Sequence, residues 1–141
     1  MAAFQKFNAF AAAMPNGNVN LGADTLKLML TNTAPVAANV QYSDISATEL
    51  ANGNGYTTGG AAVTIAGSTQ TAGTYKLACT TPVVTTATGA LGPFRYAVLY
   101  DTTPTTKSLI GFWDYGSALT LASGDTFTVT FDAANGIFQL A

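Results

Sequence analysis

Charged residues are scarce in this sequence, and histidine is absent. Asp, Glu, Lys and Arg make up 9% of the 141 residues, whereas a soluble domain usually has about 25%. Without histidine, the chain cannot build a Ser-His-Asp or Cys-His nucleophile system or the usual imidazole metal site. Its five Lys and Arg residues are scattered and do not form the basic stripe that binds phosphates, so we expect no nucleic-acid partner.

A single cysteine and the lack of long apolar runs exclude further classes. Cys79 has no second cysteine to pair with and lies in the alternating stretch 75–80, so we expect a buried free thiol and no disulfide or zinc site. The apolar run 9–14 is far shorter than the 18 or more residues of a membrane span. A turn sequence follows it at residues 15–17, where a signal cleavage site would be expected. We therefore expect no membrane partner and no signal peptide.

Carboxylates are the remaining candidates for catalysis, because a pair of them can hydrolyse a glycoside. Asp24, Asp101, Asp125 and Asp132 each lie at the end of an expected strand or next to Asn or Gly. Asp in such positions usually accepts hydrogen bonds within a turn. We therefore expect no catalytic residue, no cofactor and no metal site, and interpret the protein as a non-enzyme.

Asp114 is a separate case because aromatic residues flank it on both sides. Burial among aromatic rings would raise the pKa of this carboxyl. Alternatively, Asp114 is a strand-end residue that binds a backbone N–H or Arg95. We take an ion pair between Arg95 and Asp114 as the hypothesis to test.

The sequence is rich in threonine and consists largely of short segments with alternating apolar and polar residues. The chain has 23 threonines and 14 glycines, and from residue 56 onward short apolar segments alternate with Gly, Pro, Asn and Asp. Such spacing is typical of an all-β sandwich or barrel. The size fits a single domain over 1–141, with a sandwich over 21–141. The expected strands are 25–31, 62–66, 74–80, 82–86, 94–100, 108–114, 118–121, 126–131 and 137–140.

The first 20 residues are expected to form an N-terminal helix or arm. Phe4, Phe7 and Phe10 recur with Ala11 and Met14 at helical spacing within residues 1–14. This stripe must pack on the sheet of the same chain or on a neighbouring protein.

Two further local patterns predict turns. The Ser-x-x-Glu sequence from Ser46 to Glu49 has the form of a capping box and predicts one minor helical turn. Asn135-Gly136 between apolar segments predicts a hairpin.

The strand patterns also indicate which side chains face the core. In residues 125–132, Phe127, Val129 and Phe131 alternate with threonines, as in a strand with one open face. Residues 94–100 are apolar on both faces apart from Arg95, which predicts a central strand covered on two sides. The aromatic stripe of residues 1–14 is a candidate for one of these covers.

For Trp113 and Tyr115 the sequence allows several different roles. Both lie near the end of an expected strand. They can belong to the core, stack on sugar rings or anchor a protein interface.

Four stretches together resemble the capsid cement (decoration) proteins of short-tailed bacteriophages. They are NLGADTLK (20–27), GNGYT (53–57), GPFRYAVLY (92–100) and IGFWDYG (110–116). The resemblance implies a jelly-roll-like antiparallel β-sandwich that binds outside a shell of major capsid protein, often as a homodimer. It also implies a place on the outer capsid surface of the virion, synthesis in the host cytoplasm, and no catalytic residues.

Two other functions remain open at this point. A phage tail or fibre module that binds a host glycan is the main alternative, and a hydrolase is the third. For the cement function, the predicted protein-interface residues are Phe4, Phe7, Phe10, Trp113, Tyr115, Thr126, Thr128 and Thr130.

Overall fold

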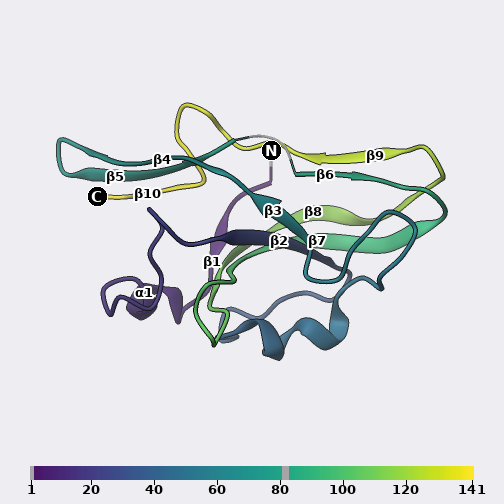
Figure 1. Cartoon of the computed structure of the whole chain (residues 1–141), viewed down its shortest axis with the longest axis horizontal. Helices are drawn as coiled ribbons and strands as arrows, with labels where there is room; N and C mark the ends of the chain where they lie inside the picture. The colour runs from purple at the N-terminus through teal and green to yellow at the C-terminus, as the bar shows by residue number, and fades with distance from the viewer. Residues whose placement is uncertain (1, 81–82) are drawn as a thin grey trace.

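Two layers of antiparallel strands face each other in the computed structural model, which describes residues 2–80 and 83–141 (Figure 1). One layer is a five-stranded sheet with the order β1-β8-β7-β2-β3. The other layer has two parts, a three-stranded sheet β10-β5-β4 and a two-stranded sheet β6-β9. The strands of the first layer are β1 (Gln5–Lys6), β2 (Leu26–Thr31), β3 (Ala61–Val63), β7 (Leu91–Asp101) and β8 (Leu109–Leu121). Those of the second are β4 (Ile65–Thr71), β5 (Thr74–Cys79), β6 (Val83–Thr86), β9 (Thr126–Val129) and β10 (Phe138–Leu140).

This architecture confirms the predicted fold class, a jelly-roll-like antiparallel β-sandwich. The strand predictions differ from the structure in several details. The segments predicted at 108–114 and 118–121 belong to one continuous strand, β8. The single strand predicted at 62–66 is divided between β3 and β4, which belong to different sheets, and β4 extends to Thr71. Strand β7 begins earlier than predicted, at Leu91, and β9 ends earlier, at Val129. Residue 82, predicted to begin a strand, lies outside the described residues.

A first core fills the space between the layers. Leu26, Leu28 and Leu30 share one face of β2 and are at most 3% exposed, as their spacing predicts. They join Leu77 of β5 and Phe94 of β7 in this core. Burial of these large side chains gives the sandwich its main driving force.

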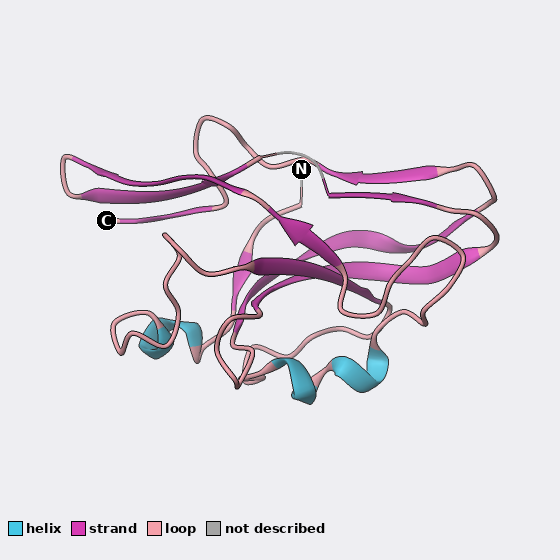
Figure 2. Ribbon diagram, in the orientation of Figure 1, coloured by secondary structure: helices cyan, strands magenta, loops and turns pink. Residues whose placement is uncertain are grey.

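A second core covers the opposite face of the five-stranded sheet. Its buried residues are Phe7, Met29, Ile45, Val98, Tyr100, Leu109 and Phe112. The helical segments η1 (Tyr42–Asp44) and η2 (Ser46–Thr48) lie on this side of the sheet (Figure 2). The buried residues of α1 (Phe10–Ala13), in contrast, belong to the first core. Strand β7 is the middle strand of the five and has a core on each face. The prediction of a central strand covered on two sides is thereby confirmed.

The N-terminal segment differs from the predicted amphipathic helix. Only Phe10–Ala13 is helical, and Gln5–Lys6 forms an edge strand against β8. The three phenylalanines consequently do not share one face. Phe10 packs in the first core and Phe7 in the second, while Phe4 is half-buried beside Trp113. The three-residue spacing misled the prediction because a short strand followed by a turn can place these rings as efficiently as a helix.

The predicted capping box at Ser46 is also wrong. The η2 turn has no side-chain cap, and Glu49 reaches away from it. The Glu49 carboxylate accepts hydrogen bonds from the hydroxyl of Tyr42, from the hydroxyl of Tyr56 at 2.6 Å and from the backbone N–H of Gly59 at 2.6 Å. Glu49 therefore joins the two loops that lie on either side of it in the sequence.

Asn135-Gly136 forms a turn but not the predicted hairpin. The strand before it, β9, pairs with β6, and the strand after it, β10, pairs with β5. Asp132 stabilises the turn by accepting bonds from the backbone N–H groups of Ala134 and Asn135 and from the Asn135 side chain. The turn carries the chain from one part of the second layer to the other.

Cys79 is a free thiol and 8% exposed, as predicted. Burial raises the pKa of the Cys79 thiol to about 11. The thiol is therefore protonated at neutral pH and unreactive.

Asp101 has a buried carboxyl with one unpartnered oxygen. The residue is 0% exposed; Oδ1 accepts the backbone N–H of Thr103 at 2.9 Å, whereas Oδ2 has no partner among the described residues. The Thr25 carbonyl accepts hydrogen bonds from the backbone N–H and the hydroxyl of Thr102, which hold the Asp24 segment alongside. Burial and, secondly, the Asp24 carboxyl raise the pKa of Asp101 to about 7.

We expect Asp101 to make the protein less stable as the pH rises from about 4 to about 7. The ordinary pKa of 3.8 applies to the unfolded chain, so within this window the native state holds a proton that the unfolded state has lost, and unfolding becomes easier. Asp101→Asn removes this dependence and can retain the bond to Thr103. At about pH 8 the variant should be more stable by roughly 2–4 kcal/mol. Urea denaturation at several pH values measures the difference, and equal pH profiles for the two proteins would contradict the assignment.

Candidate interaction groove

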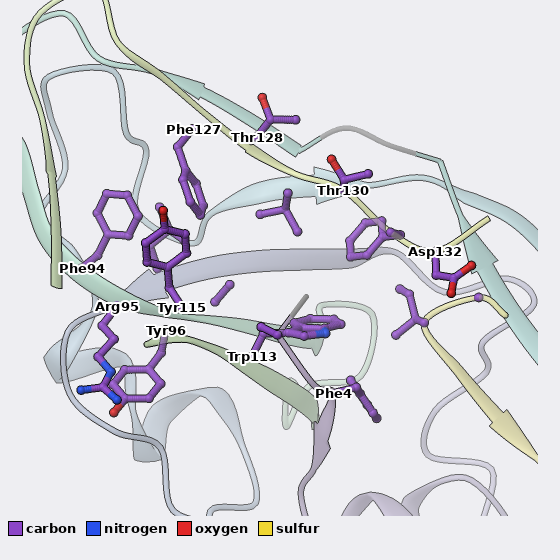
Figure 3. Close-up of a pocket in the computed structure, with 17 residues that line it drawn as sticks. Phe4, Phe94, Arg95, Tyr96, Trp113, Tyr115, Phe127, Thr128, Thr130 and Asp132 are labelled. Carbon is purple, nitrogen blue, oxygen red and sulfur yellow. The ribbon is translucent and has the colours of Figure 1, made fainter. Parts of the chain in front are cut away.

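A groove of about 330 Å³ lies between β9 on one side and β7 and β8 on the other. Figure 3 shows Trp113 and Tyr115 on one wall and Phe127 on the other. Thr128 and Thr130 also line the groove, but their side chains point away from it. Other residues that line the groove include Ala2, Phe4, Leu30, Phe94, Arg95, Tyr96, Ala97, Val129, Phe131, Asp132 and Ile137. The groove is thus mainly aromatic and apolar, as binding sites commonly are.

The rings of the groove form contacts at its two ends. Toward one end, the centroid of Trp113 is 5.3 Å from that of Phe4 and 5.8 Å from that of Phe131. Toward the other, Phe127 is 5.0 Å from Phe94 in an edge-on arrangement. Such contacts hold the rings in fixed positions, so the walls of the groove are largely pre-formed.

Tyr115 differs from its neighbours because it is 57% exposed. Its ring centroid lies 6.3 Å from that of Phe127, near the open side of the groove. A large apolar ring held in solvent at the rim of an apolar groove is a typical contact residue of a protein interface.

The strand β9 alternates as the sequence predicts. Thr126, Thr128 and Thr130 are exposed, whereas Phe127 and Val129 are half-buried. The inward residues reach the first core, and the outward threonines form a neutral surface. This alternation confirms which face of the segment is open.

Two strand edges border the groove without a neighbouring strand. Within residues 2–80 and 83–141, β9 pairs with β6 alone. Strand β8 pairs with β1 only at Gly111 and Phe112, so from Trp113 to Leu121 it has just β7 beside it. Unpaired backbone groups on edge strands are sites for the addition of another strand.

The charged side chains near the groove have bonding partners within the chain. Arg95 donates two bonds to Asp114, from Nε at 2.7 Å and from Nη2 at 2.8 Å, which confirms the hypothesis of an ion pair. The Arg95 guanidinium and the backbone N–H of Gly116 hold the pKa of the Asp114 carboxyl below its ordinary value. The turn bonds to Asp132 lower the pKa of that carboxyl in the same way. Neither carboxyl is poised for proton transfer at neutral pH.

We expect Arg95→Gln to lower the melting temperature only slightly, by about 1–3 °C, because the pair is partly exposed and solvent screens it. The side chains of Arg95 and Asp114 are 37% and 30% exposed. The difference from wild type should shrink further at about 1 M salt. Differential scanning calorimetry at low and high salt measures both effects. An unchanged melting temperature at low salt would show that the pair does not stabilise the fold.

The structure brings together five of the eight predicted interface residues, namely Phe4, Trp113, Tyr115, Thr128 and Thr130. Thr126 lies on the same open face of β9 but outside the groove. Phe7 and Phe10 are 0% and 1% exposed, so the prediction that they contact a partner is wrong. Both rings are needed to fill the cores of the chain itself.

Phe94 and Phe127 were predicted as core residues, and the structure shows that they also line the groove. No signal in the sequence distinguishes a ring that packs in a closed core from one that packs at the open end of a sandwich. The distinction depends on how far the second layer extends over the first.

Asp24 and Asp125 stabilise turns. Asp24 accepts the backbone N–H of Asn20 at 2.7 Å, and Asp125 accepts that of Ala122 at 2.9 Å. These bonds confirm the predicted turn roles. No group of three or more acidic or cysteine side chains within the described parts of the chain is placed to hold a metal ion.

Helices in the described segments are all too short or too polar to cross a bilayer. No family model, curated protein or solved structure matches the chain.

Proposed function

We propose that the chain is a virion structural protein, a cement protein that binds the outside of a phage capsid shell and stabilises the contacts between capsomers. The observation that carries the proposal is the mainly aromatic and apolar groove, bordered by edges of β8 and β9 that have no neighbouring strand among the described residues. This arrangement favours contact with another protein over chemistry on a small substrate.

The electrostatics support a role in assembly. Burying an unpaired charge in an interface is costly, and this chain has few charges, of which Arg95 and Asp132 at the groove already have partners. The open face of β9 carries threonines. Such a surface can be covered at little electrostatic cost.

A cement protein acts by mass action and needs no catalytic group. A protein that binds the assembled shell more tightly than its separate subunits shifts the equilibrium toward the assembled state. The proposed partners are the major capsid protein and a second copy of this chain in a homodimer. The proposed location is the outer capsid surface, after synthesis in the host cytoplasm.

A tail or fibre module that binds a host glycan is the second candidate, and the exposure of Tyr115 favours it. Sugar rings stack on open aromatic faces, and Tyr115 offers one. Trp113 is less suited to stacking, because Phe4 and Phe131 pack against it. Arg95 and Asp132 are occupied by other bonds and are poorly placed to bind sugar hydroxyls.

The copy number in the virion distinguishes the two candidates. Quantitative mass spectrometry of purified particles gives the ratio of this chain to the major capsid protein. We expect a ratio of the same order as that of a shell component. A ratio like that of a tail protein would favour the glycan-binding module and contradict the cement function.

A further inference from the structure

We propose that the groove binds an extended, uncharged segment of a partner protein, which adds as a new strand to the free edge of β9. The inference rests on the proposed function in one respect, namely that the partner is the shell protein. It deepens that function by stating which part of this chain makes the contact and what kind of segment it accepts.

The position of β9 makes it the outer strand of its sheet. On one side it pairs with β6 through residues Thr126–Val129, and β6 in turn lies next to β3. The groove follows the β9 side, as its lining includes residues 127–131. Among the described residues no strand pairs with the other edge of Thr126–Val129, so that edge can accept a strand that enters along the groove.

The sequence of β9 has none of the usual protection against strand addition. Exposed edge strands commonly carry Lys or Pro or are interrupted by a bulge. Between Asp125 and Asp132 the chain has only Thr, Phe and Val, and its pairing with β6 is regular. An uncharged edge with high β propensity is suited to pairing with another chain.

The walls of the groove determine the side chains of the added strand. Alternate residues of such a strand point in the same direction, and in strand addition they fill pockets while the backbone supplies hydrogen bonds. Here the inward residues would lie against Trp113 and Tyr115, which favours apolar side chains. Arg95 is already paired with Asp114, and Asp132 binds the amide groups of its own turn. A charged residue buried between the aromatic rings would therefore lose its hydration at a high cost.

The β9 strand of a second copy fits the groove less well than a free segment does. In each copy Phe127 already packs against Phe94, and Val129 packs against the first core. These inward side chains cannot leave their own sandwich to fill the groove of another. The occupant must be a segment whose inward side chains are free before binding.

Binding to particles that lack the protein tests the contact. We expect Tyr115→Lys to weaken binding at least tenfold, because the new ammonium has no partner in the groove. Val36→Lys is the matched control, since Val36 is 61% exposed and does not line the groove. We expect it to bind as wild type does. Equal binding by Tyr115→Lys and wild type would overturn the inference while leaving the cement function intact.

Photo-crosslinking identifies the occupant. Replacing Tyr115 with a benzophenone-bearing amino acid places the reactive group at the rim of the groove. We expect mass spectrometry to find it joined to an uncharged, alternating segment of the shell protein. Crosslinks to a charged segment, or only to a second copy of this chain, would overturn the inference.

Peptide binding by the isolated protein separates this inference from the proposed function. Trp113 is the only tryptophan of the chain, so its fluorescence reports on the groove. The probes are a capped peptide of alternating Val and Thr, and matched peptides in which Val is replaced by Lys or by Glu. We expect only the uncharged peptide to change the emission and to slow hydrogen exchange in β9. If wild type does not bind particles, the cement function fails; if no peptide has an effect, the strand-addition site fails.

Discussion

Replacing Glu49 with Ala should lower the free energy of unfolding by about 3 kcal/mol or more. The carboxylate accepts three hydrogen bonds from Tyr42, Tyr56 and Gly59, and Tyr56 is 4% exposed. A hydrogen bond to a charged group contributes about 1.5–3 kcal/mol, and a buried donor left without an acceptor adds a penalty. Urea denaturation measures the change, with an unaltered slope as the sign that the unfolded state is the same.

Removing one of the hydrogen-bond donors provides the control for the Glu49→Ala variant. Tyr42→Phe deletes one of the three bonds and should cost about 1–2 kcal/mol. Combining it with Glu49→Ala should cost less than the sum, because the two substitutions remove a shared contact. A loss below about 1 kcal/mol for Glu49→Ala would show that the carboxylate does not join the two loops.

Gly60→Ala should be about as damaging, with an expected loss of roughly 3 kcal/mol or more. The backbone of Gly60 has a φ of +80°, which L side chains rarely adopt. A Cβ at this position would lie 2.0 Å from the carbonyl oxygen of Leu28 and 2.8 Å from the Cα of Met29. Relief requires a shift of β2, which pairs with both β3 and β7.

Gly59→Ala is the matched control, since it lies next to Gly60 and also has a positive φ, of +97°. The nearest atom to a Cβ there is the Tyr100 hydroxyl at 3.5 Å, an ordinary contact. This variant should therefore cost only the backbone strain, about 1–2 kcal/mol. Equal losses for the two variants would show that the contact with β2 is not what requires glycine at residue 60.

The strands could be predicted from the sequence because their side chains follow a period of two. Leu26, Leu28 and Leu30 point to the core as predicted, and so does Phe127. The N-terminal segment could not be predicted in this way. A spacing of three fits a helix, but Phe7 and Phe10 pack on opposite faces of the five-stranded sheet. Their positions depend on contacts with residues far along the chain.

The groove was only partly predictable for a related reason. Composition indicated a neutral contact surface, and Trp113 and Tyr115, two residues apart in the sequence, marked one wall. The opposite wall depends on how β9 lies over β8, which no local pattern specifies. The role of Glu49 could not be predicted either. Its carboxylate bonds to Tyr56 in the following loop and does not cap a helix, as the local sequence suggested.

The ion pair of Arg95 and Asp114 shows how far local reasoning can reach. Both residues belong to neighbouring strands, and the register places Tyr96 opposite Asp114. Neighbouring residues of a regular strand point to opposite faces, so Arg95 would not share a face with Asp114. The register shifts between Phe94 and Tyr96, and this irregularity accompanies the pairing of Arg95 with Asp114. The pair satisfies both charges with each other and leaves neither Arg95 nor Asp114 without a partner at the groove.

The heat resistance of particles with and without this protein tests the central claim most directly. The protein is stripped from purified virions, or omitted during assembly, and the temperature of genome release is measured by the fluorescence of a DNA-binding dye. A cement protein that binds the assembled shell should raise this temperature, and adding wild-type protein back should restore it. Particles that release their genome at the same temperature with and without the protein would contradict the cement function.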